Sequence, residues 1–250
     1  MCNPASNYWP GKQTRPGENV EITCADGTKM EVHISRPEGD PPYPTMLIIH
    51  DYFDAENYYY DLADQYAAEG YLGVVPNLFH RQPKLAEQTH DRAGQRIGEI
   101  GDDEALKDLD TTLDHLSSDG LLGELAVTGF CWGGRLAYLF AARHPETKLL
   151  VIFYGHLTNW SGPEGNKPYS PLDEAAKVQT RVVGSYGGAD DSIPLDQVAE
   201  MESRLKATGV NAELKVYDGA AHCFFRTPEK ATESDDAWGR VLGALREAVA

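Results

Sequence analysis

The sequence predicts an α/β fold with a mostly parallel central sheet, an N-terminal antiparallel hairpin and helices on both faces. Short, nearly continuous apolar runs such as TMLIIH (45–50) and LLVIFYG (149–155) are typical of strands that are covered on both faces. These runs alternate along the chain with stretches whose apolar residues recur at helical spacing. Such alternation is typical of βαβ units, in which helices connect parallel strands.

The opening hairpin is predicted from two runs of alternating apolar and polar residues, VEITCADG (20–27) and TKMEVHISRP (28–37), which meet at Asp26-Gly27. An Asp-Gly pair between such runs is a strong hairpin signal, because the tight turn requires residues that tolerate a positive φ. The strands predicted after the hairpin share a short apolar run, and they are 45–50, 71–76, 125–129, 149–155, 180–187 and 211–219.

The predicted helices have apolar residues at intervals of three and four. One ends at Gly70 and another at Pro145, and both residue types commonly end helices. No shift in composition marks a domain boundary, so we expect one domain over residues 1–250, in which 1–18 form an irregular lead-in. The expected helices are 57–70, 104–118, 133–145, 195–209 and 230–250.

Charge and composition exclude several classes of function. The chain of 250 residues has 39 acidic and 22 basic residues and a formal net charge of -17. Nucleic acids and anionic membranes bind basic surfaces, so neither is an expected partner. No apolar run is long enough to span a membrane, and the N-terminus lacks the apolar core of a secretory signal. We therefore expect a cytoplasmic protein.

The four cysteines, Cys2, Cys24, Cys131 and Cys223, contain no CxxC pair and have no regular spacing. This spacing predicts neither a zinc site nor a disulfide framework. In the cytoplasm we expect all four thiols to be reduced.

The stretch GFCWGG (129–134) places Cys131 between glycines, after the strand 125–129 and before the helix 133–145. This fits the nucleophile-elbow pattern G-x-S-x-G with Cys in place of Ser. The flanking glycines allow a sharp turn with close approach of strand and helix, and the helix N-terminus favours a thiolate or an oxyanion. The alternative is a small buried cysteine that serves only packing.

In such an elbow architecture the acid and the histidine follow the nucleophile in that order. Asp190 follows the strand 180–187, and His222 follows the strand 211–219. Carboxyl ends of parallel strands meet at one edge of the sheet, so Cys131, Asp190 and His222 are expected to form a catalytic triad. The open alternatives are that Asp190 caps a helix, that Asp191 takes its place, or that His222 is an ordinary loop histidine.

With these motifs the chain resembles the dienelactone hydrolase (carboxymethylenebutenolidase) family of α/β-hydrolases from about residue 20 to the C-terminus. GFCWGG, GADDSIP (188–194) and AHCFFR (221–226) carry the resemblance most specifically, with AAEGYLGVVPNLFHRQP (67–83) and MLIIHDYF (46–53) as support. The resemblance implies the α/β-hydrolase fold, a Cys-His-Asp triad and hydrolysis of a lactone-ring ester to a maleylacetate. It implies no metal or organic cofactor.

The resemblance also implies roles for residues outside the triad. Arg81 and Arg226 match arginines that bind the carboxylate of the substrate, a task that suits the bidentate guanidinium in a chain of such negative charge. The backbone N–H groups of Tyr52 and Trp132 match the oxyanion hole. Asp51 stands where the family usually has a Glu that interacts with the resting thiol, so its role here is either that gate or a structural carboxylate.

We therefore expect an enzyme that cleaves a small carboxylate-bearing ester or lactone through an acyl-enzyme, as a monomer or weak homodimer. The alternatives are a general carboxylesterase or thioesterase of the same fold, and a catalytically silent scaffold that binds a small molecule. The polar stretches 82–103 and 156–172 receive no helix or strand and are expected to border the pocket.

Overall fold

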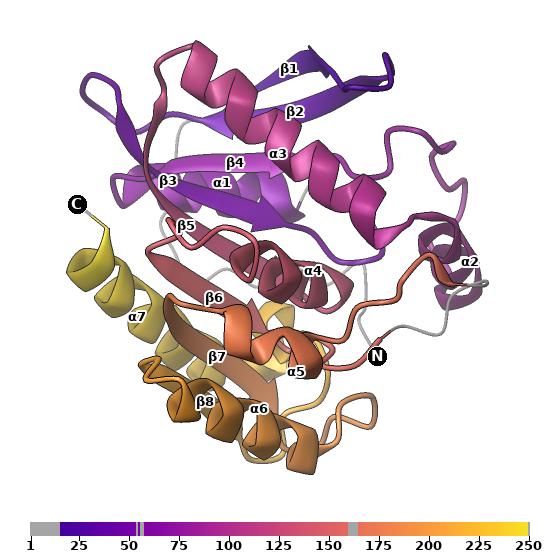
Figure 1. Cartoon of the computed structure of the whole chain (residues 1–250), viewed down its shortest axis with the longest axis vertical. Helices are drawn as coiled ribbons and strands as arrows, with labels where there is room; N and C mark the ends of the chain where they lie inside the picture. The colour runs from indigo at the N-terminus through magenta and orange to yellow at the C-terminus, as the bar shows by residue number, and fades with distance from the viewer. Residues whose placement is uncertain (1–15, 54, 56–57, 160–164, 250) are drawn as a thin grey trace.

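The structure is a computed structural model that describes residues 16–53, 55, 58–159 and 165–249. An eight-stranded sheet runs through these residues in the order β1-β2-β4-β3-β5-β6-β7-β8 (Figure 1). β2 pairs antiparallel with β1 and with β4, and every other neighbouring pair is parallel. The strands are β1 (Glu18–Thr23), β2 (Lys29–Ser35), β3 (Tyr43–Ile49), β4 (Leu72–Pro76), β5 (Leu122–Phe130), β6 (Leu149–Phe153), β7 (Arg181–Gly187) and β8 (Ala212–Tyr217).

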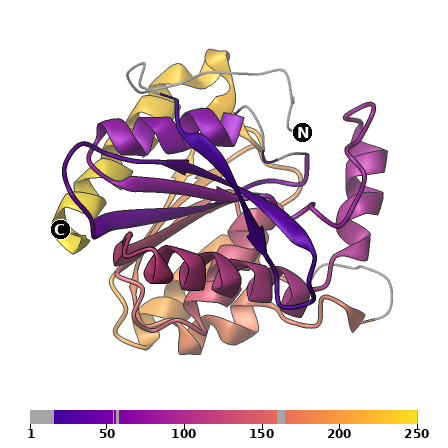
Figure 2. The same cartoon turned by 90° about the horizontal axis from the view of Figure 1, so that it is seen from above.

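Helices cover both faces of the sheet, as the sequence predicts. α1 and α7 lie on one face, and α3, α4 and α6 lie on the other (Figures 1 and 2). Strands β3 to β7 are buried almost throughout, which explains their apolar runs. The helices are α1 (Tyr58–Ala68), α2 (His90–Glu99), α3 (Asp102–Ser118), α4 (Trp132–Ala141), α5 (Pro171–Glu174), α6 (Leu195–Ala207) and α7 (Ala231–Ala248), with short 3₁₀ turns at Ala175–Lys177, Phe224–Arg226 and Pro228–Lys230.

The chain order of the sheet reverses beside β3. The chain passes from β3 to β4 on one side and then returns to β5 on the other, from which it continues outward to β8. In open α/β sheets the crevice for a ligand opens at the carboxyl ends of the strands at such a reversal. The loop after β3 and the turn after β5 both lie at this edge.

Two helical segments lie wholly or partly in the stretches for which the sequence predicted no element: α2 lies within 82–103, and α5 begins at the end of 156–172. α2 buries only Ala93, Arg96 and Ile97, so its apolar periodicity is too weak to read from the sequence. Its N-cap is Thr89, whose hydroxyl accepts a hydrogen bond from the Arg92 N–H at 3.4 Å. α5 is a single turn that begins with a proline.

A buried ion pair joins α4 to α3. Arg135 donates to both carboxylate oxygens of Asp102, at 2.5 and 2.8 Å, and both side chains are fully buried. The same guanidinium donates to the backbone carbonyls of Thr158 and Tyr169, at 3.1 and 2.5 Å. Arg135 therefore fixes the loop after β6 against the helix that follows the elbow.

Asp102→Asn is expected to lower the free energy of unfolding by about 3–5 kcal/mol, because it leaves the buried guanidinium without a compensating charge. The matched control is Asp103→Asn, since Asp103 pairs with Arg143 at 3.1 Å on the exposed surface. That change should cost less than about 1 kcal/mol. Urea unfolding of both variants measures the difference, and equal losses would contradict a special role for the buried pair.

Candidate active site

Cys131 stands on a strained corner between β5 and α4. Its φ is 55° and its ψ is −115°, a conformation that a residue with a Cβ rarely adopts. A Cβ on Gly133 would lie 2.2 Å from the carbonyl oxygen of His50, and one on Gly129 would lie 2.2 Å from that of Gly133. The corner therefore forms only with glycine at both positions, which is the reason for the motif GFCWGG.

The backbone of Cys131 is held from the neighbouring strand. Its N–H donates to the carbonyl of Phe153 at 3.1 Å, and its own carbonyl accepts from the N–H of His156 at 3.4 Å. Trp132 is the first residue of α4, so its N–H has no carbonyl partner within the helix. That amide is therefore available at the turn where the sequence predicts one oxyanion donor.

Asp190 and His222 lie on loops that follow β7 and β8, as predicted. His222 Nδ1 lies 2.6 Å from Asp190 Oδ2, and both side chains are almost fully buried. Cys131 Sγ lies within 4.8 Å of a ring nitrogen of His222. Because Nδ1 is engaged by Asp190, Nε2 is the nitrogen available to the thiol.

The charges in this group favour a protonated imidazole. Burial opposes protonation of His222, but the charge of Cys131 and the hydrogen bond to Asp190 outweigh it and raise the pKa of His222 to about 10. Burial also disfavours ionised Asp190, yet the hydrogen bond from His222 and its charge lower the pKa of that carboxyl. The arrangement thus favours a protonated His222 ring, held by Asp190 on one side and facing Cys131 on the other.

His156 is a second imidazole at the site that the sequence analysis did not select. Its ring centroid lies 5.7 Å from that of His222, and one of its ring nitrogens lies within 4.8 Å of Cys131 Sγ. Burial and the nearby charge of His222 lower the pKa of His156 to about 3, so its ring is neutral. The signal that could have found it is its place just after the buried strand β6, at the same edge of the sheet.

Asp51 and Arg226 form a buried ion pair at this edge. Arg226 Nη1 donates to Asp51 Oδ2 at 3.1 Å, and Asp51 Oδ1 accepts from the N–H of Phe53 at 2.8 Å. The guanidinium carbon lies 4.5 Å from the centre of the Tyr58 ring, a cation–π contact. Asp51 is thus bonded to an arginine, and the predicted gating of the thiol by Asp51 stays a prediction.

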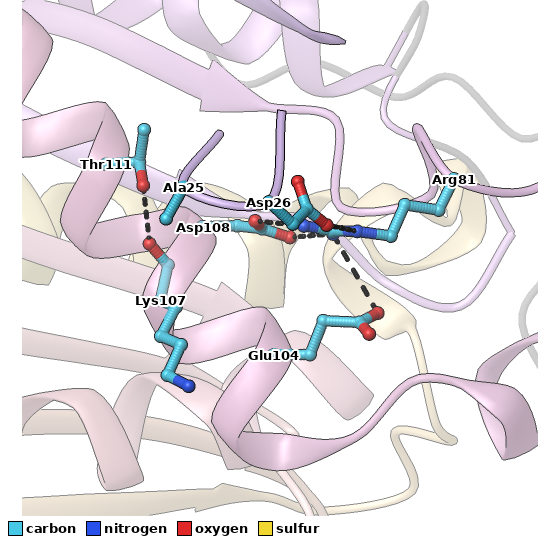
Figure 3. A pocket seen from close by; sticks show the side chains of 7 residues that line it. All are labelled: Ala25, Asp26, Arg81, Glu104, Lys107, Asp108 and Thr111. Atoms are coloured by element: carbon cyan, nitrogen blue, oxygen red, sulfur yellow. Dashed lines mark hydrogen bonds and ion pairs between the residues drawn. The ribbon is translucent and has the colours of Figure 1, made fainter. Parts of the chain in front are cut away.

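Arg81 lies in a different pocket, of about 390 Å³, between the β1–β2 turn and α3 (Figure 3). Its guanidinium forms a bidentate pair with the buried Asp108, at 2.6 and 3.0 Å, and also bonds Asp26 at 2.8 Å. Glu104 lies 3.8 Å away. The structure thus engages Arg81 with three carboxylates, and its predicted role in substrate binding stays a prediction.

The loop that carries Tyr52 is anchored by α2. His90 Nδ1 is hydrogen-bonded to the Tyr52 hydroxyl, and the Arg96 guanidinium donates to the carbonyl of Phe53. Burial raises the pKa of Tyr52, and the charges of Cys131 and Asp51 raise it further. The phenol is therefore a neutral group close to the thiol.

Comparison with known proteins bears on what these residues do. A model of the dienelactone hydrolase family matches residues 30–249. The chain belongs to the dienelactone hydrolase family. Membership makes it an ester hydrolase, and the resemblance inferred from the motifs is confirmed, as is the fold.

Individual relatives agree with this membership. A provisionally assigned carboxymethylenebutenolidase of Escherichia coli K12 is 33% identical over 225 residues, which are 87% of this chain and 82% of that protein. A provisionally assigned 2-oxo-3-(5-oxofuran-2-ylidene)propanoate lactonase of Bradyrhizobium is 26% identical, over 88% and 90%. The crystal structure of a provisionally assigned dienelactone hydrolase from Klebsiella pneumoniae superposes with a TM-score of 0.82 at 31% identity, over 92% of this chain and 98% of that one.

The cysteines of this dienelactone hydrolase family member differ from the expectation of reduced thiols. Cys24 and Cys131 are free, but Cys223 is disulfide-bonded. The expected reduced state therefore fails at Cys223, because sequence spacing alone does not reveal which thiols meet in space. Cys2 lies outside the described residues.

Two groups of described side chains have the donor types and spacing that could hold a metal ion. The first is Cys131, His156 and His222 at the elbow, and the second is Cys24, His80 and Asp108 beside Arg81. In each group the donor atoms lie within 4.8 Å of one another.

Gly133→Ala is expected to lower the free energy of unfolding by about 2 kcal/mol or more, because the new Cβ would overlap the His50 carbonyl. Gly243→Ala in α7 is the matched control, since a Cβ there meets nothing within 4 Å. That change should raise the free energy of unfolding by about 0.5–1 kcal/mol. Urea unfolding measures both, and a neutral Gly133→Ala would contradict the crowded corner.

Asp190→Asn is expected to lower the pKa of His222 by about 1 unit or more, because it removes the charge-assisted hydrogen bond. In the wild type the raised pKa stabilises the fold fully below about pH 6.5, and this contribution is lost as the pH rises to about 10. NMR titration of the His222 ring measures the shift. Asp191→Asn is the control and should leave the titration unchanged; a shift in that variant alone would assign the pairing to Asp191.

Proposed function

We propose that this protein hydrolyses the ester bond of a small lactone that carries a carboxylate, of the dienelactone-to-maleylacetate type. Cys131, His222 and Asp190 act as the triad, and an acyl-enzyme is the intermediate. The observation that carries the proposal is the buried 2.6 Å contact of His222 with Asp190, with the imidazole also beside the thiol of the elbow. The named lactonase activity of the Bradyrhizobium relative supports a substrate of this class.

In the first half of the reaction the Cys131 thiolate attacks the carbonyl carbon of the lactone. The backbone N–H groups of Trp132 and Tyr52 stabilise the oxyanion of the tetrahedral intermediate. Collapse of this intermediate breaks the ring C–O bond, and the His222 imidazolium gives its proton to the leaving oxygen. The opened ring stays attached through a thioester.

In the second half His222, now neutral, takes a proton from water as that water attacks the thioester. The C–S bond breaks and the Cys131 thiolate returns, with the imidazolium beside it. The product acquires a second carboxylate. Asp190 holds the His222 ring in one tautomer and stabilises its charge in both halves.

Arg226 is our candidate for binding the substrate carboxylate. It is buried at the site edge and already pairs with a carboxylate, Asp51, at 3.1 Å. Asp51 bonds Arg226 at Nη1, whereas the Arg81 guanidinium is engaged at Nε, Nη1 and Nη2 by Asp26 and Asp108. We therefore place substrate recognition on Arg226 and a structural ion pair on Arg81.

Cys131→Ala is expected to reduce kcat/KM for a dienelactone and for an activated aryl ester by about 10⁴-fold or more, because the nucleophile is lost. Cys24→Ser is the control, since Cys24 is also a buried free thiol but contacts His80 and not the triad histidine. It should retain activity. Circular dichroism verifies that both variants fold. If Cys131→Ala were still active, Cys131 would not be the nucleophile and the proposed triad would play no part in hydrolysis.

Arg226→Gln is expected to raise KM for a carboxylate-bearing lactone about 10- to 100-fold, from loss of a charged hydrogen bond of about 1.5–3 kcal/mol. kcat/KM for the methyl ester of the same lactone should change little by comparison. Arg81→Gln is the control: it should lower stability, because Asp108 loses its partner, and leave the ratio of the two substrates unchanged. Equal effects of Arg226→Gln on both substrates would favour a general carboxylesterase or thioesterase.

A further inference from the structure

The elbow of this protein brings three metal-binding side chains together. Cys131 Sγ, a ring nitrogen of His156 and a ring nitrogen of His222 all lie within 4.8 Å of one another. His222 Nε2 is buried and makes no hydrogen bond of ordinary geometry to any described residue. A buried nitrogen that is aimed at a thiol and a second imidazole is poised for a shared ligand.

The donor set is one that tetrahedral zinc sites use. Thiolate and neutral imidazole are preferred ligands of Zn²⁺ and Co²⁺, and three protein ligands leave a fourth position for water. In such a site the donor atoms lie about 3.3–3.6 Å apart, from metal distances of about 2.3 Å to sulfur and about 2.0–2.1 Å to nitrogen. The present separations, up to 4.8 Å, need to contract by no more than about 1.5 Å, within reach of side-chain rotation.

The groups around the three donors suit a metal as well. Asp190 bonds His222 Nδ1 at 2.6 Å, so the carboxylate orients the imidazole and directs Nε2 toward the metal. The His156 N–H donates to the Cys131 carbonyl at 3.4 Å, which fixes the backbone of two ligands against each other.

We propose that Cys131, His156 and His222 form an inhibitory binding site for a divalent transition metal of the zinc type. The metal bonds the thiolate and both imidazoles, and the proton held by His222 is released to solvent. Nucleophile and general base are then occupied together, so hydrolysis stops while the metal is bound. The metal is an inhibitor, and it takes no part in the reaction.

The second group with metal-binding side chains, Cys24, His80 and Asp108, is a poorer site. Cys24 Sγ and His80 Nε2 lie 3.6 Å apart, a suitable distance. However, Asp108 gives both oxygens to Arg81, and the guanidinium places a positive charge next to any cation. This second group therefore serves as an internal control.

The test is a Co²⁺ titration of the whole chain without substrate. Cobalt bound to a thiolate gives a sulfur-to-metal charge-transfer band in the near ultraviolet, and tetrahedral cobalt gives strong visible bands. We expect both in the wild type. Cys131→Ser should abolish the charge-transfer band, and His156→Gln should weaken Co²⁺ binding about 10-fold or more. Cys24→Ser should leave the spectrum unchanged.

A second measurement does not depend on any variant. Zn²⁺ should protect Cys131 of the wild type from alkylation by iodoacetamide, as peptide mass spectrometry reports, and a chelator should restore the alkylation rate. No charge-transfer band, or a band that survives Cys131→Ser and disappears in Cys24→Ser, would overturn the inference. Because neither measurement uses a substrate, metal binding is tested separately from the proposed hydrolysis, and only the inhibitory effect rests on that proposed function.

Discussion

Close backbone contact at the turn after β5 is the constraint on which the site depends. Gly129 and Gly133 lie so near neighbouring carbonyls that a Cβ on either would come within 2.2 Å of an oxygen. At this contact Cys131 adopts its strained conformation, with a φ of 55°. Packing and ion pairs elsewhere in the fold stabilise this strained backbone conformation.

Two buried ion pairs stabilise the segments around this turn. The ion pair of Arg135 with Asp102 connects α4 to α3, and Arg135 also bonds the segment after β6. The ion pair of Arg226 with Asp51 connects the Phe224–Arg226 turn to the loop after β3. In a chain with a net charge of -17, Arg135 and Arg226 are each matched by a buried carboxylate, so neither pair leaves an isolated charge in the interior. The partly buried Arg81 likewise pairs with the buried Asp108.

The proposed triad differs from these pairs, because one ring nitrogen of its histidine has no ordinary hydrogen bond to a described residue. His222 is held by Asp190 on one side, while its other nitrogen meets the thiol without an ordinary hydrogen bond to any described residue. In our proposals this nitrogen is the atom that receives a reacting proton or a metal ion. Two neutral groups complete the surroundings, the His156 imidazole and the Tyr52 phenol.

The sequence by itself determined the fold and the triad candidates, because both depend on local signals. Buried parallel strands are apolar runs, and an elbow needs glycines on both sides of its nucleophile, so GFCWGG and the loops after 180–187 and 211–219 could be recognised. Only the tertiary structure decided which charged side chains meet. It paired Arg81 with Asp108, brought His156 beside Cys131 and gave the polar stretch before α3 a helix, because these depend on contacts between segments far apart in the chain.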